Sequence, residues 1–277
     1  MRIAHALIGL ALCPLIAFGA IDNGSWSLAA AEQGKVQFSL ARSSAGHHFD
    51  TSSPWQLAEL RGLDWATAAK HDVHFTIARD AGTIDCNGFV QDERGAGLFT
   101  FKPNPQFLQE MQQQGFSFKD EELFSATVFD VSLEFVRALK GLSVQGLDAG
   151  KLMAFRIHGV SPEFVRDLHA AGVQATEADK LIAFRIHGVS PEFVKELRGA
   201  GINVTDEDKL IAFRIHGVSP EFAGELSHLG YPHAPPEQLI ALRIHGVTPE
   251  YIESLRSKGL QNLTLDQLIS MRIHGID

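Results

Sequence analysis

The second half of the chain is built on an internal repeat. The tetrapeptide Arg-Ile-His-Gly occurs five times, and successive copies begin 29 residues apart, at Arg156, Arg185, Arg214, Arg243 and Arg272. A constant period of this length is typical of arrays in which each repeat forms one supersecondary unit and packs only on its neighbours. This period restricts the possible folds more than any other feature of the sequence.

Each repeat carries start and stop signals for two short helices. In residues 190–197, Ser suits the N-cap, Pro the first helical position and Glu the positive end of the helix dipole. We expect this helix to stop within residues 199–201, because glycine accepts the left-handed conformation that closes a helix. A second helix is expected to begin at Thr205 or Asp206 and to end at Gly217.

Helical geometry, at about 100° per residue, predicts which faces are buried. The apolar side chains of the first helix fall within an arc of about 120°, so that helix is one-sided. In the second helix, Leu210, Ile211, Phe213 and Ile215 spread over about 200°, which predicts that it forms a largely covered inner layer. Arg214 falls inside this arc, so we expect it to be buried and paired with helix-terminal carbonyls or the Glu of Ser-Pro-Glu.

The motif His lies outside the apolar arc, where we expect it to have a structural role at the C-terminus of its helix. Stacked helices place equivalent atoms about 10 Å apart, whereas two ligands of one zinc ion each lie about 2 Å from it, so these His residues cannot share a metal. The predicted structural motif comprises Arg156, His158, Gly159, Arg185, His187, Gly188, Arg214, His216, Gly217, Arg243, His245, Gly246, Arg272, His274 and Gly275.

Residues 1–20 resemble a secretory signal peptide. One positive residue precedes an uncharged apolar run that ends in small residues at Ala17, Gly19 and Ala20. This predicts a periplasmic or secreted protein that is cleaved near Gly19 or Ala20. Two alternatives remain open, namely cleavage after Ala31 and an uncleaved segment that anchors the protein in a membrane.

The cysteine content and the net charge restrict the possible cellular location and partners of the protein. Cleavage would leave Cys86 as the only thiol, which excludes an intramolecular disulfide, and Leu12 is larger than the residue that normally precedes a lipidated Cys13. Export without disulfides fits the bacterial envelope. The remaining 23 basic and 33 acidic residues give a net charge near −10. Nucleic acid is therefore not an expected partner, because its binding depends on cationic neutralisation of phosphates.

Residues 33–103 are predicted to form a small antiparallel β-domain of at least four strands. Apolar and polar residues alternate there, and turn residues separate the runs at 35–42, 73–79, 83–90 and 96–102. Residues 53–60 resemble a short capped helix, but an extended segment that places Trp55 in the core is the alternative.

Helical signals return after Pro103. Residues 104–150 contain degenerate copies of the repeat, which we expect to cap the array, and regular repeats fill residues 151–277. The predicted fold class is therefore α+β, with a small antiparallel β-domain followed by a short α-solenoid of 29-residue helix-turn-helix repeats.

The β-region pattern and the repeats together resemble a bacterial repeat family of unassigned function. The pattern consists of residues 79–83, 86–88, 95–97, 99–101 and 103–107, followed by Arg-x-His-Gly-Val repeats. In that family such repeats often follow the membrane metallopeptidase domain of regulators resembling the antibiotic-sensing M56, or BlaR1, type. The resemblance covers about residues 33–277. No His-Glu-x-x-His motif and no multi-span region occur in this chain, so no catalytic residue is carried over.

The β-region also contains two groups of residue types that can bind metals. They are His47, His48 and Asp50, and His71, Asp72 and His74. We predict no metal or cofactor, since His71 and His74 would not lie side by side on one strand. A nucleophile elbow, a phosphate loop and a dinucleotide fingerprint are absent from the sequence. The His-Gly-Val turn also differs from a DNA-binding helix-hairpin-helix, because it has one Gly and is closely followed by Glu.

These features predict a non-enzymatic, exported repeat protein that acts as a protein-interaction or scaffold module in the bacterial envelope. A protein partner is expected, without a nucleic acid, small-molecule substrate or cofactor. The alternative is a sensory or regulatory accessory related to M56/BlaR1-type signalling, which rests on the resemblance. Membrane contact is expected only if the N-terminal segment stays uncleaved.

Overall fold

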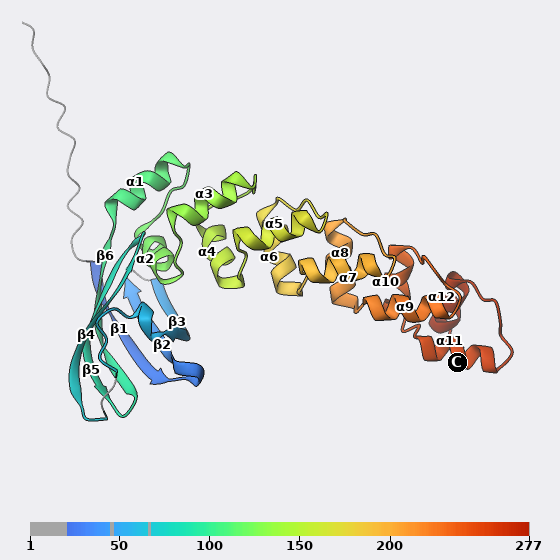
Figure 1. The fold of residues 1–277 in the computed structure, drawn as a ribbon, viewed down its shortest axis with the longest axis horizontal. Helices are drawn as coiled ribbons and strands as arrows, with labels where there is room; N and C mark the ends of the chain where they lie inside the picture. The colour runs from blue at the N-terminus through green and yellow to red at the C-terminus, as the bar shows by residue number, and fades with distance from the viewer. Residues whose placement is uncertain (1–20, 45–46, 66–67, 277) are drawn as a thin grey trace, which may run out of the picture. The chain divides into compact units, whose positions relative to one another are not determined.

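The computed structural model of the protein describes residues 21–44, 47–65 and 68–276 (Figure 1). They divide into two compact units, one ending at Pro105 and the other beginning at Gln106. An antiparallel sheet forms the first unit and helices form the second, so the predicted α+β class is confirmed. The predicted signal peptide, residues 1–20, lies outside the described residues.

Six antiparallel strands form one sheet in the order β3-β2-β1-β6-β5-β4. β1 pairs with both β2 and β6 and thereby joins the two halves of the sheet. The strands are β1 (Ile21–Ala30), β2 (Lys35–Ser44), β3 (His47–Gln56), β4 (His71–Arg79), β5 (Gly82–Gln91) and β6 (Arg94–Pro103).

The sequence pattern predicts neither β1 nor β3. The helical interpretation of residues 53–60 is wrong, because β3 continues to Gln56 and only the short 3-10 turn Leu57–Glu59 follows it. The extended alternative is correct, and it places Trp55 in the core. Pro54 is tolerated because β3 lies at the edge of the sheet, where a missing N–H donor breaks no ladder.

The sheet curls around an aromatic core. The Phe75 ring of β4 lies 5.0 Å from the Trp26 ring of β1 and 6.0 Å from the Phe38 ring of β2, although β4 neighbours neither strand in the sheet. The chain after β3 then pairs Arg61 with Thr76 of β4. The two ends of the sheet are therefore brought together through this segment.

The position of Trp26 explains why two residues of the β-region must be glycine. Its indole N–H donates hydrogen bonds to the carbonyl oxygens of Asn87 and Leu98, both at 3.2 Å. The ring consequently lies against Gly88 and Gly97, which pair across β5 and β6. A Cβ atom on Gly97 would lie 2.0 Å from the Asn87 oxygen and 2.7 Å from the indole nitrogen, so a side chain is excluded there.

Twelve helices occupy the described residues after Asn104. Most of them begin after a side-chain cap or at a proline, as their boundary residues predict. The helices are α1 (Pro105–Gln113), α2 (Asp120–Val128), α3 (Leu133–Gly141), α4 (Ala149–His158), α5 (Pro162–Ala170), α6 (Ala178–His187), α7 (Pro191–Gly199), α8 (Glu207–His216), α9 (Pro220–His228), α10 (Pro236–Ile244), α11 (Pro249–Ser257) and α12 (Leu265–Ile273).

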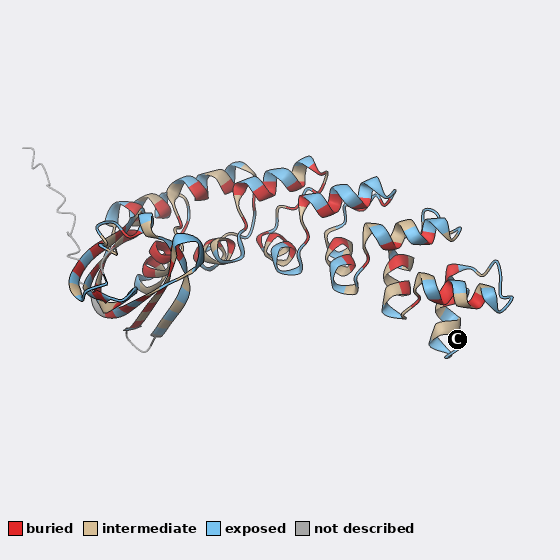
Figure 2. Cartoon of the chain, turned by 60° about the horizontal axis from the view of Figure 1, so that its bottom comes forward, coloured by how far each residue is buried: buried red, intermediate tan, exposed pale blue. Residues whose placement is uncertain are grey.

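From α2 onward, each helix contacts the helix two positions further along the chain. The helices α2, α4, α6, α8, α10 and α12 form what we call the even layer, and α3, α5, α7, α9 and α11 form the odd layer. Figure 2 shows buried residues where the two layers face each other and exposed residues on their outer sides.

The start and stop signals of the repeat are confirmed in detail. The Ser190 hydroxyl caps α7 and accepts a hydrogen bond from the Phe193 N–H at 3.2 Å. Asp206, and not Thr205, caps α8 by accepting from the backbone three residues later. Gly217 ends α8 in the left-handed region, at φ +71°, which favours glycine.

The prediction that the second helix of each repeat is covered on most of its circumference is wrong. On α8, Leu210 and Phe213 are buried and Ile211 is half-buried, but Ile215 is 55% exposed. At 100° per residue, Ile215 lies about 170° from the midpoint between the two buried side chains. The even layer has the odd layer on one side only, so the opposite side of each helix stays open to solvent.

Candidate interaction surface

The Arg of each motif reaches back to the preceding repeat. The Arg214 Nε–H donates to the carbonyl oxygen of His187 at 3.4 Å. This oxygen belongs to the last turn of α6, where carbonyls have no partner within the helix. Helix-terminal carbonyls were one of the two predicted acceptors, and this prediction is confirmed. The same bond, at 3.1 and 3.3 Å, joins Arg185 to His158 and Arg243 to His216.

Each of these guanidinium groups also lies over an aromatic ring. The Arg214 Cζ atom is 4.7 Å from the centre of the Phe193 ring. A cation above a ring is attracted by the ring quadrupole, by about 0.5 to 1 kcal/mol at an exposed site. The aromatic residue of one repeat is therefore the partner of the next motif Arg. Distances of 4.7 to 5.2 Å recur in Arg156–Phe135, Arg185–Phe164, Arg243–Phe222 and Arg272–Tyr251.

The motif Arg is not buried among apolar side chains, which corrects the prediction from the helical arc. Arg214 stays exposed, because its long side chain runs along the surface toward Phe193 on the preceding helix. The Glu of Ser-Pro-Glu, the other predicted acceptor, has a different role. Glu192 accepts from its own N–H and from the Ser190 hydroxyl, and these bonds lower the pKa of its carboxyl group.

The motif Gly leaves room for this Arg. Gly188 has φ +74°, and a Cβ atom placed on it would lie only 2.9 Å from Nη2 of Arg214. The position therefore demands glycine for two reasons, the left-handed backbone and the guanidinium above it. Gly159 and Gly217 meet Arg185 and Arg243 in the same way, at 2.8 and 2.9 Å.

A second contact joins successive even-layer helices near their N-termini. Lys180 on α6 forms an ion pair with Asp208 on α8, and both side chains are accessible to solvent. Exposed pairs of this kind contribute little individually, from about 0 to 1 kcal/mol. These contacts nonetheless recur at the same position between successive even-layer helices. The equivalent contacts are Lys151–Asp179, Lys209–Glu237 and Gln238–Asp266.

The exposed Ile of the motif has no role in these junctions. Ile215 points away from the odd layer, and its four equivalents are just as open. We call these five residues the isoleucine row. Hydrophobicity alone does not predict them, because each Ile falls within the wide apolar arc of its helix. The angle of each Ile relative to the buried Leu and Phe could have identified the row. The row consists of Ile157 (55% exposed), Ile186 (57%), Ile215 (55%), Ile244 (53%) and Ile273 (57%).

The motif His stands next to the row, at the C-terminal end of each helix. His158, His187, His245 and His274 are exposed, and His216 is half-buried. The backbone carbonyls of three of them accept from a motif Arg, as described above. Among the rings, that of His274 contacts the Ser270 carbonyl oxygen through Nδ1 at 2.7 Å. The imidazole rings of the motif His residues therefore lie at the surface beside the isoleucines.

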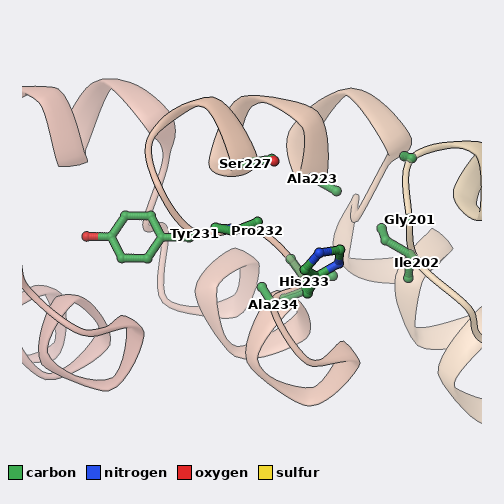
Figure 3. Close-up of a pocket in the computed structure, with 10 residues that line it drawn as sticks. Gly201, Ile202, Ala223, Ser227, Tyr231, Pro232, His233 and Ala234 are labelled. Carbon is green, nitrogen blue, oxygen red and sulfur yellow. The ribbon is translucent and has the colours of Figure 1, made fainter.

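The repeat is irregular where α9 and α10 meet the segment that follows α7. Ala223 stands where the other repeats have a buried Val or Ile, and a pocket of about 100 Å³ lies beside it. His233 lies between Gly201 and Ala234 at this pocket, while Tyr231 points away (Figure 3). The missing branched side chain accounts for the space. The residues at this position in the other repeats are Val136, Val165, Val194 and Ile252.

The described His side chains of the β-unit do not gather into one site. His71 shares hydrogen bonds with the carbonyl oxygens of Ala69 and Asp64, and these bonds raise its pKa. The His47 side chain lies outside the described residues. Among the described residues, no group of three or more His, Cys, Asp or Glu side chains is placed to hold a metal ion. The other pairs are His48–Asp50 at 4.0 Å and His74–Asp85 at 2.8 Å.

No protein-family model matches the chain, and no curated protein matches it. Among the described helices, none combines the length and the apolar character needed to cross a membrane.

Proposed function

We propose that the helical unit is an α-solenoid that binds a protein partner through the isoleucine row, in a protein exported to the bacterial envelope. The layered packing supports the solenoid, since each repeat supplies one helix to each layer and contacts its neighbours. The Arg and Lys contacts support it further, because both join a residue of one repeat to the next repeat along the chain.

One observation carries the proposed binding role. The Ile of the motif is more than half exposed and is nevertheless identical in all five repeats. Packing explains identity at buried or contact-making positions, such as the motif Arg and Gly. It does not explain an invariant apolar side chain that faces solvent.

The repeats have diverged enough for this identity to be informative. One exposed position of the odd layer holds four different residues, and even a buried position of the even layer varies. The first position carries exposed Arg166, Lys195 and Glu253 and half-buried Gly224, and the second carries buried Phe155, Phe184, Phe213 and Leu242 and half-buried Met271. Ile has been retained where the fold tolerates other side chains.

A row of exposed apolar side chains is a usual feature of protein-binding surfaces. Covering one Ile side chain completely contributes about 1.5 to 3 kcal/mol before the costs of association are subtracted. Several isoleucines acting together therefore suffice for a specific complex. The even layer also holds them on a rigid scaffold, which lowers the ordering cost on binding.

Co-purification of the tagged protein from its native host tests the proposal. The triple variant Ile186→Ser, Ile215→Ser, Ile244→Ser should fold normally, because these side chains are exposed. The matched control is Arg166→Ser, Lys195→Ser, Glu253→Ser on the odd layer. We expect specific proteins to be depleted from the Ile variant and retained by the control. Identical protein profiles for the two variants and the wild type would contradict the proposed surface.

Export is a separate part of the proposal. It is supported by the signal-peptide pattern of residues 1–20. Fractionation of cells should recover the protein from the periplasm or the medium, with residues near 1–20 removed. Recovery from the cytoplasm alone, with an intact N-terminus, would contradict export but leave the interaction surface standing.

A further inference from the structure

The odd-layer helices carry a cation contact of their own. Arg198, in the last turn of α7, donates from Nη2 to the carbonyl oxygen of Ala171 at 2.6 Å. Ala171 is the C-cap of α5, where the helix carbonyls have no partner within the helix. A cation on one helix therefore closes the end of the helix two positions earlier in the chain. The equivalent contacts are Arg256–Leu229 and Lys140–Gln114.

The helix α9 lacks this cation. Ser227 stands at its position, 29 residues after Arg198. By the same 29-residue spacing, the acceptor would be the carbonyl oxygen of Ala200, the C-cap of α7. Within the described part of the chain, no residue donates a hydrogen bond to this oxygen. His169, the remaining residue at this position, contacts the carbonyl oxygen of Ala175 in its own loop through Nε2 at 3.1 Å.

The pocket of about 100 Å³ lies where this side chain is missing. Ala200, Gly201 and Ser227 line it, together with Ala223 one turn before Ser227 on α9 (Figure 3). His233 forms another wall, and its Nδ1 atom lies 4.0 Å from the position of a Cβ atom on Gly201. Ser227 and His233 are exposed, so the pocket opens to solvent. At about 30 Å³ per water molecule, the space is that of about three waters, enough for a small planar head group.

The glycine at this pocket is suited to a guanidinium group. Between α5 and α7, a Cβ atom on Gly172 would lie 2.6 Å from Nη2 of Arg198, so the guanidinium there takes the space that a side chain would need. Gly201 lies 29 residues after Gly172 and has a similar left-handed backbone, at φ +84° against φ +91°. The pocket therefore retains the glycine and the open helix end of the cation contact and lacks only the cation.

We propose that this pocket binds the guanidinium group of a second molecule, of the kind that an arginine side chain carries on its aliphatic stem. The guanidinium donates to the Ala200 carbonyl oxygen, as Arg198 does to that of Ala171. The negative end of the α7 dipole favours a cation there, and the His233 ring offers a flat face on which a guanidinium stacks. The stem takes the space beside Ala223 that a branched side chain fills in the other repeats.

Two other classes of ligand do not fit this pocket. An anion would meet the carbonyl oxygens at the C-terminal end of α7, which repel it. A purely apolar ligand would cover the Ala200 carbonyl oxygen and remove its hydration without replacing the lost hydrogen bond. The pocket contains no residue of the isoleucine row, so the proposal goes beyond the proposed function and does not depend on it.

Nuclear magnetic resonance of the purified protein tests the proposal with three probes. They are the blocked peptide acetyl-Gly-Arg-Gly-amide, the same peptide with citrulline in place of Arg, and agmatine, a free alkylguanidinium. We expect the Arg peptide to shift the amide signals of Gly201 and Ala234 with a Kd of about 1 to 10 mM. The citrulline peptide should bind at least about tenfold more weakly, because its head group carries no charge. Equal binding of the two peptides, or binding of neither the Arg peptide nor agmatine, would overturn the proposal.

A variant that supplies the missing cation gives an independent test. Ser227→Arg should close the site, lower the affinity for the Arg peptide by about tenfold or more, and raise the urea midpoint of the protein. A loss of binding in a more stable variant cannot come from unfolding. The control His228→Arg adds the same group one residue further along α9 and should change the affinity by less than about twofold. Unchanged binding by Ser227→Arg, or equal weakening by both variants, would overturn the site.

The two guanidinium probes identify the source of the ligand. Binding of the Arg peptide assigns the pocket to an arginine of another polypeptide, and binding of agmatine alone assigns it to a free guanidinium compound. The proposed site stands in both cases. If the isoleucine variants leave co-purification unchanged while the Arg peptide still binds, the proposed function fails and this site stands.

Discussion

The Cζ atom of Arg214, on the even-layer helix α8, lies 4.7 Å from the centre of the Phe193 ring on the odd-layer helix α7. The Arg lies in the last turn of its helix, and the Phe lies in the first turn of the helix before it. Residues 185–193 join one motif Arg to the Phe of the helix that follows it, but these two side chains belong to different contacts. Arg185 contacts Phe164 and Phe193 contacts Arg214, so each contact forms only when the two layers pack together.

The first prediction concerns this contact. Arg214→Ala should lower the free energy of unfolding by about 1 to 2 kcal/mol, from the lost ring contact and the hydrogen bond to the His187 carbonyl. His216→Ala should cost less than about 0.5 kcal/mol, because its ring makes no junction contact described above and surface substitutions usually have small effects. Urea denaturation followed by circular dichroism measures both.

The shape of the Arg214→Ala transition is informative as well. Each repeat is stabilised by its interfaces with the neighbouring repeats. Loss of the Arg214 contact in the middle of the array should therefore broaden the unfolding transition. A larger loss for His216→Ala, or equal losses for the two variants, would contradict the assignment of the junction to Arg214.

The second prediction compares two glycines, one that caps the end of α6 and one that is the last residue of α7. Gly188→Ala should destabilise the array by about 1 to 2 kcal/mol, because φ is +74° and the new methyl group meets Arg214. Gly199→Ala should be neutral or stabilising by up to about 1 kcal/mol, since this glycine is helical and has open space around it. Thermal denaturation of the two variants should therefore show shifts that differ in sign or size, and equal shifts would refute the steric account.

The helix boundaries could be predicted because their signals are local. The cap of Ser190 and the left-handed Gly217 follow from residue type and position alone. β1 could also have been predicted as a strand, because buried Trp26 and Leu28 alternate with serines in its sequence. β3 did not, because an edge strand with a polar sequence shows little alternation.

The isoleucine row could not be predicted from hydrophobicity. Ile215 is as apolar as the buried Leu210, and the helical wheel gave both a place in one wide arc. What decides between them is the number of layers that cover the helix. That number depends on tertiary packing, which propensity and periodicity do not contain.

The third prediction concerns the irregular repeat. Ala223→Val restores the side chain found at this position in the neighbouring repeats and should stabilise the array by about 0.5 to 1 kcal/mol, because it fills part of the 100 Å³ pocket. Val194→Ala should open a similar space and cost about 2 kcal/mol. Urea midpoints compare the two variants, and destabilisation by Ala223→Val would show that the pocket cannot accept a branched side chain.

The fourth prediction concerns pH. The Glu of each Ser-Pro-Glu or Thr-Pro-Glu segment accepts hydrogen bonds from its own N–H and from the cap hydroxyl, which lowers its pKa. The four residues are Glu163, Glu192, Glu221 and Glu250. A carboxyl group whose pKa falls on folding stabilises the fold above the unfolded value, about 4.3, and loses this effect as the pH falls through the folded value.

Urea midpoints between about pH 7 and pH 3 measure this effect. The wild-type protein should lose stability below about pH 4.5, and a variant with all four residues changed to Gln should show a flatter profile. The variant Asp167→Asn, Glu196→Gln, Glu225→Gln serves as the control, because these carboxylates do not cap helices. Profiles that coincide for the wild type and the four-Gln variant would contradict the capping role.

Photo-crosslinking in living cells tests the central claim, that the isoleucine row is the binding surface, most directly. Benzoylphenylalanine replaces Ile215 in one variant and Lys195, on the odd-layer helix α7, in the other. Both sites are exposed, so both variants should fold. We predict a discrete protein adduct from position 215 and none from position 195. The same adducts from both positions, or none from position 215, would contradict the account.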